Sequence, residues 1–413
     1  MRTFYGWRVV SAAFVVAVFG WGVGFYGPPI YLYAVQEARG WPLVLVSTAI
    51  TTHFLTGAVV IANLPRLYAR FGVPNITKAG ALSLAAGVFG WACVQEPWQL
   101  FAAALLSGAG WVAMGAAAVN AFISPWFIRS RPAALAMAYN GASIGGVIFS
   151  PLWAAAIGIL GFPTASAVIA IVMVITIWVV ADRTLSRTPQ QMGLRPDGDA
   201  AGVPAVSLTS PSAKPLPGSK LWGDFGFITL SAGMALGLFA QIGLLAHLFS
   251  LLTPALGASV AGLAIGGATA AAIAGRTLVG WLMPGHADRR LVACVSYIVQ
   301  IGGSIVLVLA AGTNTILLLI GTILFGAGIG NATSLPPLIA QVEFATEDVA
   351  RVIALIVAIA QGGYAFAPAA FGLIRELAPA ASAASPAAAP YVFIAAAVIQ
   401  TLAILAFLSG RRR

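Results

Sequence analysis

Long apolar segments constrain this chain more than any other feature of its sequence. Twelve of them are long enough to cross a hydrocarbon core about 30 Å thick, which takes around 20 residues of helix. Hydrophobic residues make up 60% of the 413 positions, and charged residues make up 8%. Backbone groups inside a bilayer must satisfy their own hydrogen bonds, and uninterrupted apolar runs do so as helices, not as barrel strands. We therefore expect an all-α membrane protein.

The twelve segments fall into two sets of six, separated by a polar stretch. That stretch, 183–221, is rich in Pro, Gly, Ser and charge, which is typical of a linker. We predict an N-terminal six-helix bundle over 1–182, a cytoplasmic linker over 183–221 and a C-terminal six-helix bundle over 222–413. The predicted spans are 8–34, 43–69, 77–95, 99–127, 133–160 and 163–182, then 223–252, 255–283, 290–311, 315–341, 350–374 and 389–409.

Basic residues predict the orientation of these helices. If the N-terminus is cytoplasmic, Arg39 and Arg375 fall outside, Arg276 falls within a span, and the rest of the 21 Lys and Arg residues face the cytoplasm. An excess of Lys and Arg marks cytoplasmic loops. We expect a multi-pass protein of the cell (inner) membrane with both termini in the cytoplasm. Because the net charge of +10 is spread over short loops, we expect no nucleic acid partner.

Arg276 is a permanent charge inside the apolar segment 255–283. A guanidinium keeps its proton at every accessible pH. At membrane depth it costs about 2.5–3.5 kcal/mol on insertion scales, so such residues normally face an aqueous cavity or an opposite charge. The acidic residues lie near span ends or in loops, so an anionic substrate would supply the missing charge. The alternative is that Arg276 extends along its helix to the cytoplasmic surface.

The two halves share short glycine patterns. Gly145 to Pro151 reads GGVIFSP and Gly362 to Pro368 reads GGYAFAP, while GAG occurs at Gly108 to Gly110 and again at Gly326 to Gly328. These pairs fall in the fourth and fifth spans of each half. Parallel repeats of this kind are typical of secondary transporters, whose halves move about a central site to give alternating access.

Two local patterns resemble those of a known family. The opening YGWRVV at Tyr5 to Val10 is similar to an aromatic-Gly-Trp entry into a first helix. The segment WFIRSRPAALAMAYNGASIG at Trp126 to Gly145 is similar to a signature that leads into a fifth helix. With these patterns the whole chain resembles the major facilitator superfamily, and within it the branch of monocarboxylate transporters and bacterial oxalate/formate exchangers. The resemblance implies the major facilitator fold, with twelve transmembrane helices in two pseudo-symmetric bundles.

The same resemblance implies roles for individual residues. Arg276, within AGRTLVG, occupies the place of the branch's substrate-binding arginine in helix 8. The planar fork of an arginine meets a carboxylate in two parallel hydrogen bonds. Tyr26 and Tyr33, seven residues apart on one face of helix 1, correspond to exchanger tyrosines that would hydrogen-bond a carboxylate. Their alternative role is aromatic packing beside Pro28 and Pro29.

The chain also departs from this branch. Ala272 stands one turn before Arg276, where animal monocarboxylate transporters carry an aspartate, and their helix 1 lysine is missing too. Proton symport through those groups is therefore not expected, although an anion can still be exchanged or carry a proton itself. Ala360 and Gln361 stand where oxalate exchangers have a second basic residue. One buried positive charge suits a monoanion better than a dianion.

Charged residues near the cytoplasmic rim are candidates for controlling conformation. The family's loop between helices 2 and 3 is represented here by Arg70, but its aspartate is missing. The counterpart in the second half places Asp288 and Arg289 slightly further on, so we expect a charge pair between the halves at Asp288. Arg129 and Arg131 also lie at the rim, where they either gate or only set the topology.

Polar residues inside the spans of the second half are further candidates. A polar side chain in hydrocarbon needs a partner, so each one either lines a substrate cavity or bonds to a neighbouring helix. The candidates for substrate contact are His247, Asn331, Gln361 and Tyr364.

Enzyme motifs are not expected to function in this chain. GASIG at Gly141 to Gly145 fits a nucleophile elbow, and GVGFYG at Gly22 to Gly27 fits a dinucleotide loop. Both lie inside spans, without the preceding strand that such motifs need. The three histidines have no ligand spacing, so we expect no metal site, no cofactor and no catalysis.

These observations together predict a monomeric secondary transporter, working by symport or antiport, that moves a small organic monoanion with a proton or against a counter-anion. Two alternatives stay open. One is an exporter of neutral or amphipathic compounds, in which Arg276 is structural and an apolar cavity near Trp111 takes the substrate. The other is a membrane sensor or partner-binding protein that does not transport, although the linker is too short and too polar to fold as a signalling domain.

Overall fold

The computed structural model describes residues 4–198, 218–284, 287–377 and 389–411. Within these ranges the regular structure is helical, and no strand is present. Eleven helical segments are long and apolar enough to cross a membrane. One of them, α10 (Phe225–Leu282), has 58 residues and a length of about 87 Å, which is enough for two crossings. With α10 taken as two crossings, the described residues contain the twelve that the sequence predicts.

A sharp break at Gly257 divides α10 into two halves. Gly257 has a φ of +72°, in the left-handed region that favours glycine. Pro254, one turn earlier, has no backbone N–H to donate to the preceding turn. The two predicted spans 223–252 and 255–283 therefore exist, but they are joined by a kink instead of a loop.

Contacts divide the chain into two compact units. Unit 1 contains residues 1–41 and 52–207, and unit 2 contains residues 42–51 and 208–413. The helices of unit 1 are α1 (Tyr5–Gly24), α2 (Pro28–Arg39), α3 (Leu43–Phe71), whose first turns belong to unit 2, α4 (Val73–Cys93), α5 (Pro97–Ala113), α6 (Ala116–Ile123), α7 (Arg131–Leu160) and α8 (Phe162–Val180). The helices of unit 2 are α9 (Gly218–Leu221), α10, α11 (Arg289–Leu309), α12 (Thr315–Glu343), α13 (Thr346–Tyr364), α14 (Ala367–Leu377) and α15 (Pro390–Ser409).

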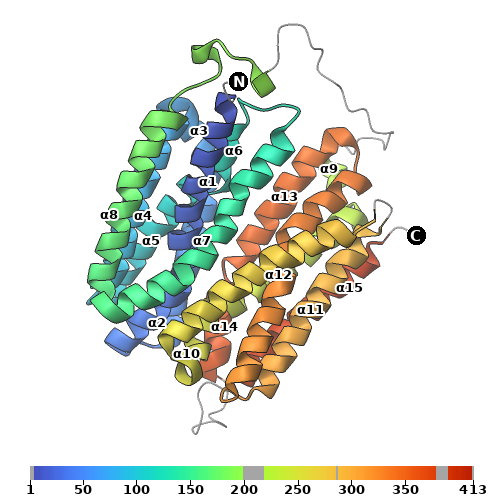
Figure 1. Cartoon of the computed structure of the whole chain (residues 1–413). Helices are drawn as coiled ribbons and strands as arrows, with labels where there is room; N and C mark the ends of the chain where they lie inside the picture. The colour runs from blue at the N-terminus through green and yellow to red at the C-terminus, as the bar shows by residue number, and fades with distance from the viewer. Residues whose placement is uncertain (1–3, 199–217, 285–286, 378–388, 412–413) are drawn as a thin grey trace. The chain divides into compact units, whose positions relative to one another are not determined.

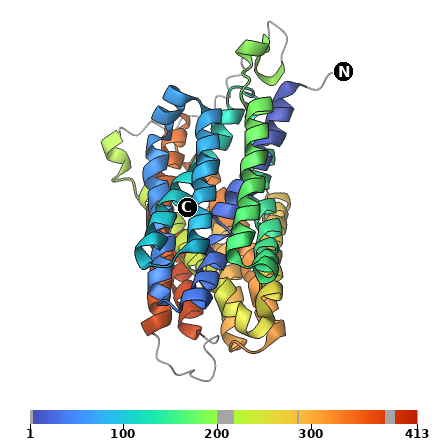
Figure 2. The ribbon, with the colours of Figure 1, turned by 90° about the vertical axis from the view of Figure 1, so that its left-hand side faces the viewer.

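Helices within each unit run side by side along much of their length (Figure 1). Figure 2 shows α8 lying along α4 in unit 1, and the two helices are in contact. The predicted linker 183–221 falls partly outside the described residues. Its described beginning forms a turn of π-helix over Ala181–Leu185 and short 3₁₀ turns over Gln190–Met192 and Pro196–Gly198. The domain boundaries that the sequence suggests stay a prediction.

Three predicted spans are interrupted in the structure. The span 8–34 is split into α1 and α2, because Pro28 and Pro29 start a new helix after Gly24. The span 99–127 is split into α5 and α6 around Gly115, and the span 350–374 is split into α13 and α14 just before Pro368. Each pair of helices still forms one candidate membrane span, so the predicted spans are confirmed and the breaks lie inside them.

The repeated GAG pattern makes equivalent helix contacts in the two units. In unit 1, a Cβ on Gly108 would lie 2.1 Å from the carbonyl oxygen of His53 on α3, and a Cβ on Gly110 would lie 2.3 Å from the backbone nitrogen of Leu84 on α4. Distances this short show that the helices touch through bare backbone. The fourth span of unit 1 therefore packs on its second and third spans through these two glycines.

Unit 2 repeats this arrangement. A Cβ on Gly326 would lie 2.4 Å from the carbonyl oxygen of Ala268 on the second half of α10, and a Cβ on Gly328 would lie 2.4 Å from that of Ser296 on α11. Small residues at helix interfaces allow this close packing in membranes. The second pattern does not repeat in this way, because Gly145 touches Val18 closely whereas nothing lies within 4 Å of a Cβ on Gly362.

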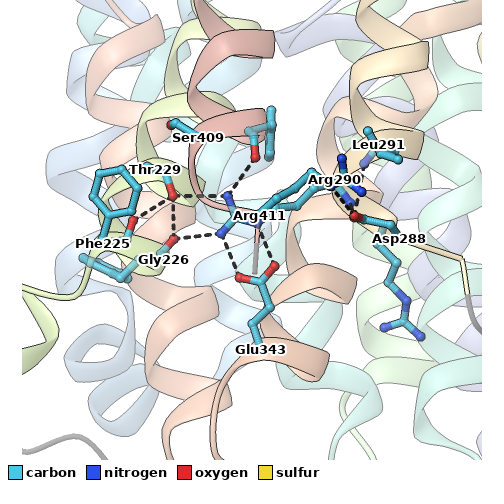
Figure 3. A network of polar contacts seen from close by, with 12 residues as sticks. Phe225, Gly226, Thr229, Asp288, Arg290, Leu291, Glu343, Ser409 and Arg411 are labelled. Carbon is cyan, nitrogen blue, oxygen red and sulfur yellow. Dashed lines mark hydrogen bonds and ion pairs between the residues drawn. The ribbon is translucent and has the colours of Figure 1, made fainter. Parts of the chain in front are cut away.

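One buried ion pair joins four helix ends in unit 2 (Figure 3). Arg290, at the start of α11, is 1% exposed and binds both carboxylate oxygens of Glu343 at the end of α12, at 2.6 and 2.7 Å. Its remaining N–H groups donate to the carbonyl oxygen of Gly226 and the hydroxyl of Thr229 on α10, and to the carbonyl oxygen of Phe407 on α15. All five donors of the guanidinium are therefore satisfied.

Replacing Gly326 with Ala tests the backbone contact between α10 and α12. We expect Gly326→Ala to lower the free energy of unfolding by about 1–3 kcal/mol, because the new methyl group would press on the backbone of Ala268. Gly280→Ala is the matched control, because nothing lies within 4 Å of a Cβ there. The measurement is denaturant unfolding of the purified protein in detergent. Equal stability of the two variants would contradict the tight contact.

Replacing Glu343 with Gln tests the buried ion pair. We expect Glu343→Gln to cost about 3 kcal/mol, because it leaves the buried guanidinium of Arg290 without its counter-charge. Arg411→Ala is the control. Its guanidinium pairs with Asp288 at 2.5 Å, but the two side chains are 40% and 32% exposed, so we expect a loss within about 1 kcal/mol. Similar losses in both variants, measured by the same unfolding assay, would show that the Arg290 network is not special.

Candidate functional site

The guanidinium of Arg276 lies beside the middle of α12. Arg276 is half-buried on the second half of α10, and its Nε donates a 2.9 Å hydrogen bond to the carbonyl oxygen of Gly330. About 20 Å of α12 extends on each side of Gly330. The side chain therefore has a partner inside the protein, a backbone carbonyl, which reasoning from the positions of acidic residues did not anticipate.

Small residues bring α10 and α12 close enough for this bond. A Cβ on Gly330 would lie 2.2 Å from the carbonyl oxygen of Ala272, and a Cβ on Gly275 would lie 2.1 Å from that of Ala327. The Gly330 carbonyl also accepts a bond from the hydroxyl of Ser334 at 3.2 Å. Because the backbones touch, the short reach from Arg276 to a mid-helix carbonyl becomes possible. The bond through Nε also sets the plane of the guanidinium.

Asn331 follows Gly330 on α12 and is 3% exposed. Beside it, Ser296 and Tyr297 of α11 and Phe407 of α15 leave a gap that is too small for a water molecule. Asn331 is the residue next to Gly330, whose carbonyl oxygen accepts the hydrogen bond from Arg276. Arg276 and Asn331, both predicted to contact the substrate, therefore lie in the same region of unit 2.

The other predicted residues of unit 2 lie on different helices. Gln361 and Tyr364 are half-buried in the last turn of α13, and Tyr364 packs against the hydrophobic cluster of unit 2. His247 is fully buried on the first half of α10, where its Nε2 lies 2.9 Å from the carbonyl oxygen of Pro368 on α14. His247 thus bonds to a neighbouring helix, one of the two roles that the sequence left open.

Tyr26 and Tyr33 belong to unit 1 and do not share one continuous helix. Tyr26 lies in the break between α1 and α2, where its ring contacts Phe25 at 5.1 Å, and Tyr33 lies within α2. Both are half-buried. The expectation that they lie on one helical face is wrong, because the prolines at the start of α2 interrupt the helix between them.

Asp288 and Arg289 are engaged within unit 2. One oxygen of Asp288 caps α11 by accepting from the backbone N–H groups of Arg290 and Leu291, and the other pairs with Arg411 (Figure 3). Arg289 donates from Nη1 to the carbonyl oxygen of Leu338 on α12 at 2.6 Å. The partners that the structure gives Asp288 therefore belong to its own half of the chain.

The predicted rim arginines of unit 1 differ in how far they are buried. Arg131 donates from Nε to the carbonyl oxygen of Phe127 and from Nη2 to that of Ser124, so it satisfies carbonyls beside the end of α6. Arg129 is exposed, and exposed Arg70 stacks over the ring of Phe71 at 5.1 Å.

The two signature-like patterns pack against each other in unit 1. The ring of Tyr5 lies 5.2 Å from that of Trp126, and the ring of Trp7 lies 5.0 Å from that of Phe127. The start of α1 is therefore fastened to the loop that enters α7. The sequence alone does not reveal this contact, because the two motifs are far apart along the chain.

Asp197 is a further residue at this place that sequence reasoning missed. Its carboxylate accepts the backbone N–H groups of Ile128, Arg129 and Ser130 at 2.8–3.0 Å. Burial raises the pKa of Asp197, but the hydrogen bonds from Arg129, Ser130 and Ile128 outweigh that effect and hold the pKa below its ordinary value. The described part of the linker thus docks on the loop before α7, and its isolated Asp-Gly pair gave no signal of this role.

Arg375 and Tyr31 were also missed as structural partners. Arg375 on α14 donates from Nη1 to the hydroxyl of Ser250 on α10 at 2.6 Å. Tyr31, which is 1% exposed, bridges the break in the first span by donating to the carbonyl oxygen of Val23 at 3.0 Å. Within the described ranges, no group of three or more His, Cys, Asp or Glu side chains is placed to hold a metal ion.

Comparison with known proteins identifies the family. The family model described as Major Facilitator Superfamily matches residues 10–368. A curated relative, the MFS transporter asaE of Aspergillus flavus, is 26% identical over 393 residues, which cover 90% of this chain and 80% of the relative.

Solved transporter structures share the fold. The crystal structure of the nucleoside transporter NupG aligns with a TM-score of 0.73 at 12% identity, covering 99% of both chains. The crystal structure of a bacterial homolog to the human lysosomal transporter Spinster, in an inward-facing and occupied conformation, aligns with a TM-score of 0.69 at 13% identity, covering 99% of this chain and 96% of the other. At these identities the likeness concerns the fold alone. The family match spans most of the chain, the chain has the long apolar helices of a multi-pass membrane protein, and it belongs to the Major Facilitator Superfamily.

Proposed function

We propose that this membrane transporter is a secondary active transporter of a small monocarboxylate, and that Arg276 binds the carboxylate. One observation carries the proposal: the guanidinium lies at mid-height of α12, bonded to the Gly330 carbonyl. That position supports a role at membrane depth over the alternative in which the side chain extends to the cytoplasmic surface.

The chemistry of the group favours an anionic cargo. A backbone carbonyl orients a guanidinium without changing its net charge, whereas a carboxylate neutralises it and makes charge-assisted hydrogen bonds. Those bonds are strong where water is scarce, because the effective dielectric constant is low. A carboxylate is therefore the chemical class that this position suits best.

Other parts of the proposal follow from the sequence. Ala360 and Gln361 stand where a second cation would serve a dianion, so the cargo is a monoanion. The distribution of basic residues places both termini in the cytoplasm of a cell membrane. The remaining predicted contacts, Tyr26, Tyr33, His247, Asn331, Gln361 and Tyr364, stay secondary candidates. Transport would proceed by alternating access, without chemical change of the cargo and as a monomer.

A second candidate function has one observation in its favour. The Arg276–Gly330 bond ties α10 to α12, so Arg276 also has a structural use. If that is its whole role, the chain would carry neutral or amphipathic compounds, and the guanidinium would only hold two helices together.

Replacing Arg276 separates the two candidates. We expect Arg276→Ala to reduce counterflow of labelled monocarboxylates in proteoliposomes at least about 30-fold, because truncating one partner of a desolvated charge pair costs about 2 kcal/mol or more. Arg276→Lys should retain part of the flux, because it keeps the charge and loses the planar fork. Arg66→Ala, at an exposed arginine of α3, is the charge-matched control and should transport normally.

Two results would reject the monocarboxylate proposal. One is carboxylate counterflow that is equal in wild type and Arg276→Ala. The other is flux of lipophilic dyes, without carboxylate flux, that does not change in the variant, which would support the exporter instead.

A further inference from the structure

A histidine and an arginine lie together where the first half of α10 packs on α14 in unit 2. Fully buried His247 contacts the carbonyl oxygen of Pro368 through Nε2. The hydroxyl of Ser250 donates to the carbonyl oxygen of His247 at 2.9 Å and accepts from Arg375 at 2.6 Å. Gly243 allows the close approach, because a Cβ there would lie 2.3 Å from the ring of Phe371. Arg375, Ser250 and His247 therefore form one connected group.

The contact with Pro368 determines which ring nitrogen of His247 carries the proton. A carbonyl oxygen can only accept, so Nε2 must be the donor, and this tautomer is assigned from its partner. In a neutral imidazole, Nδ1 then has a lone pair and no proton. Nδ1 is buried and has no hydrogen-bond partner. The single hydroxyl proton of Ser250 is already donated to a carbonyl. His247 thus presents a vacant proton acceptor inside the protein.

Arg375 is the charge that acts on this acceptor. Its neighbour Glu376 accepts the backbone N–H of Val44 at 2.7 Å. The first half of α10 has no charged residue within it, and neither has α15 or the segment 42–51. The charges of α13 lie in its first two turns, about 20 Å or more from its last residue, Tyr364, which precedes α14. In α11 and α12 the charged residues are Arg289, Arg290 and Glu343. Arg290 pairs with Glu343 beside Gly226 at the start of α10, and Arg289 bonds to the carbonyl oxygen of Leu338.

We propose that His247 is a proton-binding site controlled by Arg375, in which Nδ1 takes a proton when a carboxylate neutralises the guanidinium. With Arg375 uncompensated, a second positive charge on the neighbouring imidazole is repelled, and burial strengthens the repulsion. A carboxylate on Arg375 removes that repulsion. Proton and carboxylate then bind together, which is the condition for symport of a carboxylate that meets Arg375 on its way to or from Arg276. The identity of the carboxylate as the cargo rests on the proposed function.

The step is a simple protonation. Hydronium transfers a proton to Nδ1, one N–H bond forms, and the imidazole becomes an imidazolium with its Nε2–H still donated to Pro368. The incoming carboxylate and the incoming proton cancel, so the local net charge stays at +1. This proton site needs neither the aspartate nor the helix 1 lysine of animal monocarboxylate transporters. The absence of those two residues is the reason that the sequence did not predict proton symport.

Nitrogen NMR of the full chain, labelled with ¹⁵N-histidine in detergent, tests the proposal. The chain has three histidines, and the spectrum of His247→Gln identifies the signal of His247. In sodium chloride we expect Nδ1 of the wild type to stay unprotonated from about pH 8 to pH 5. We expect Nδ1 of Arg375→Gln to take a proton at a higher pH than the wild type does, because the repelling charge is gone while the imidazole stays buried. Arg375→Lys keeps the charge and should behave like the wild type. It also controls for misfolding.

The second arm replaces chloride with sodium acetate or sodium L-lactate at equal ionic strength. We expect the wild-type midpoint to rise by at least about one pH unit, which is a tenfold gain in proton affinity. The same titration in wild type and Arg375→Gln, or an Arg375→Lys variant that titrates like Arg375→Gln, overturns control by the charge of Arg375. A wild type that is insensitive to both carboxylates overturns the coupling. The proposed function is tested by a different experiment, the counterflow assay. If the proposed function is wrong, counterflow is the same in wild type and Arg276→Ala, whatever the NMR titration shows.

Discussion

Direct backbone contact between α10 and α12 is the constraint on which the candidate site depends. Gly326 and Gly330 on α12 face Ala268 and Ala272 on α10, one turn apart, and no side chain separates the helices. Because of this closeness, a side chain rooted on α10 can bond to a carbonyl at the middle of α12. A methyl group at either glycine would push the helices apart and move the guanidinium of Arg276. The position of the charge is thus a consequence of small residues on both helices.

Three arginines of unit 2 differ in their hydrogen-bond partners. Arg290 is paired with Glu343, and all of its donors are used, which is typical of a structural ion pair. Arg276 donates a hydrogen bond to the Gly330 carbonyl and Arg375 to the hydroxyl of Ser250, and both of these acceptors are neutral oxygens. A hydrogen bond to a neutral oxygen orients a guanidinium but does not cancel its charge. We therefore propose transport roles for Arg276 and Arg375 and a structural role for Arg290.

The sequence predicted the spans well, because about twenty apolar residues in a row can do little else in a membrane. It also located the glycine repeat, and the GAG pattern of that repeat makes the same helix contacts in both units. The sequence did not predict the partners of individual side chains, because those partners depend on tertiary contacts. The partner of Arg276 is a carbonyl oxygen, which every residue carries and no motif marks. Arg290 and Glu343 are far apart in sequence, and only the fold brings them together. The break at Pro28 separated two tyrosines that a continuous helix would have aligned.

Anion-dependent stability of the purified protein tests the central claim most directly. A ligand that binds the folded protein raises its stability by about 2.7 kcal/mol at a hundred times its dissociation constant. Our account predicts that one or more members of a panel of monocarboxylates raise the thermal unfolding midpoint of the wild type, and that the rise disappears in Arg276→Gln. An equal rise in both proteins, or stabilisation by neutral solutes and by no carboxylate, would contradict it.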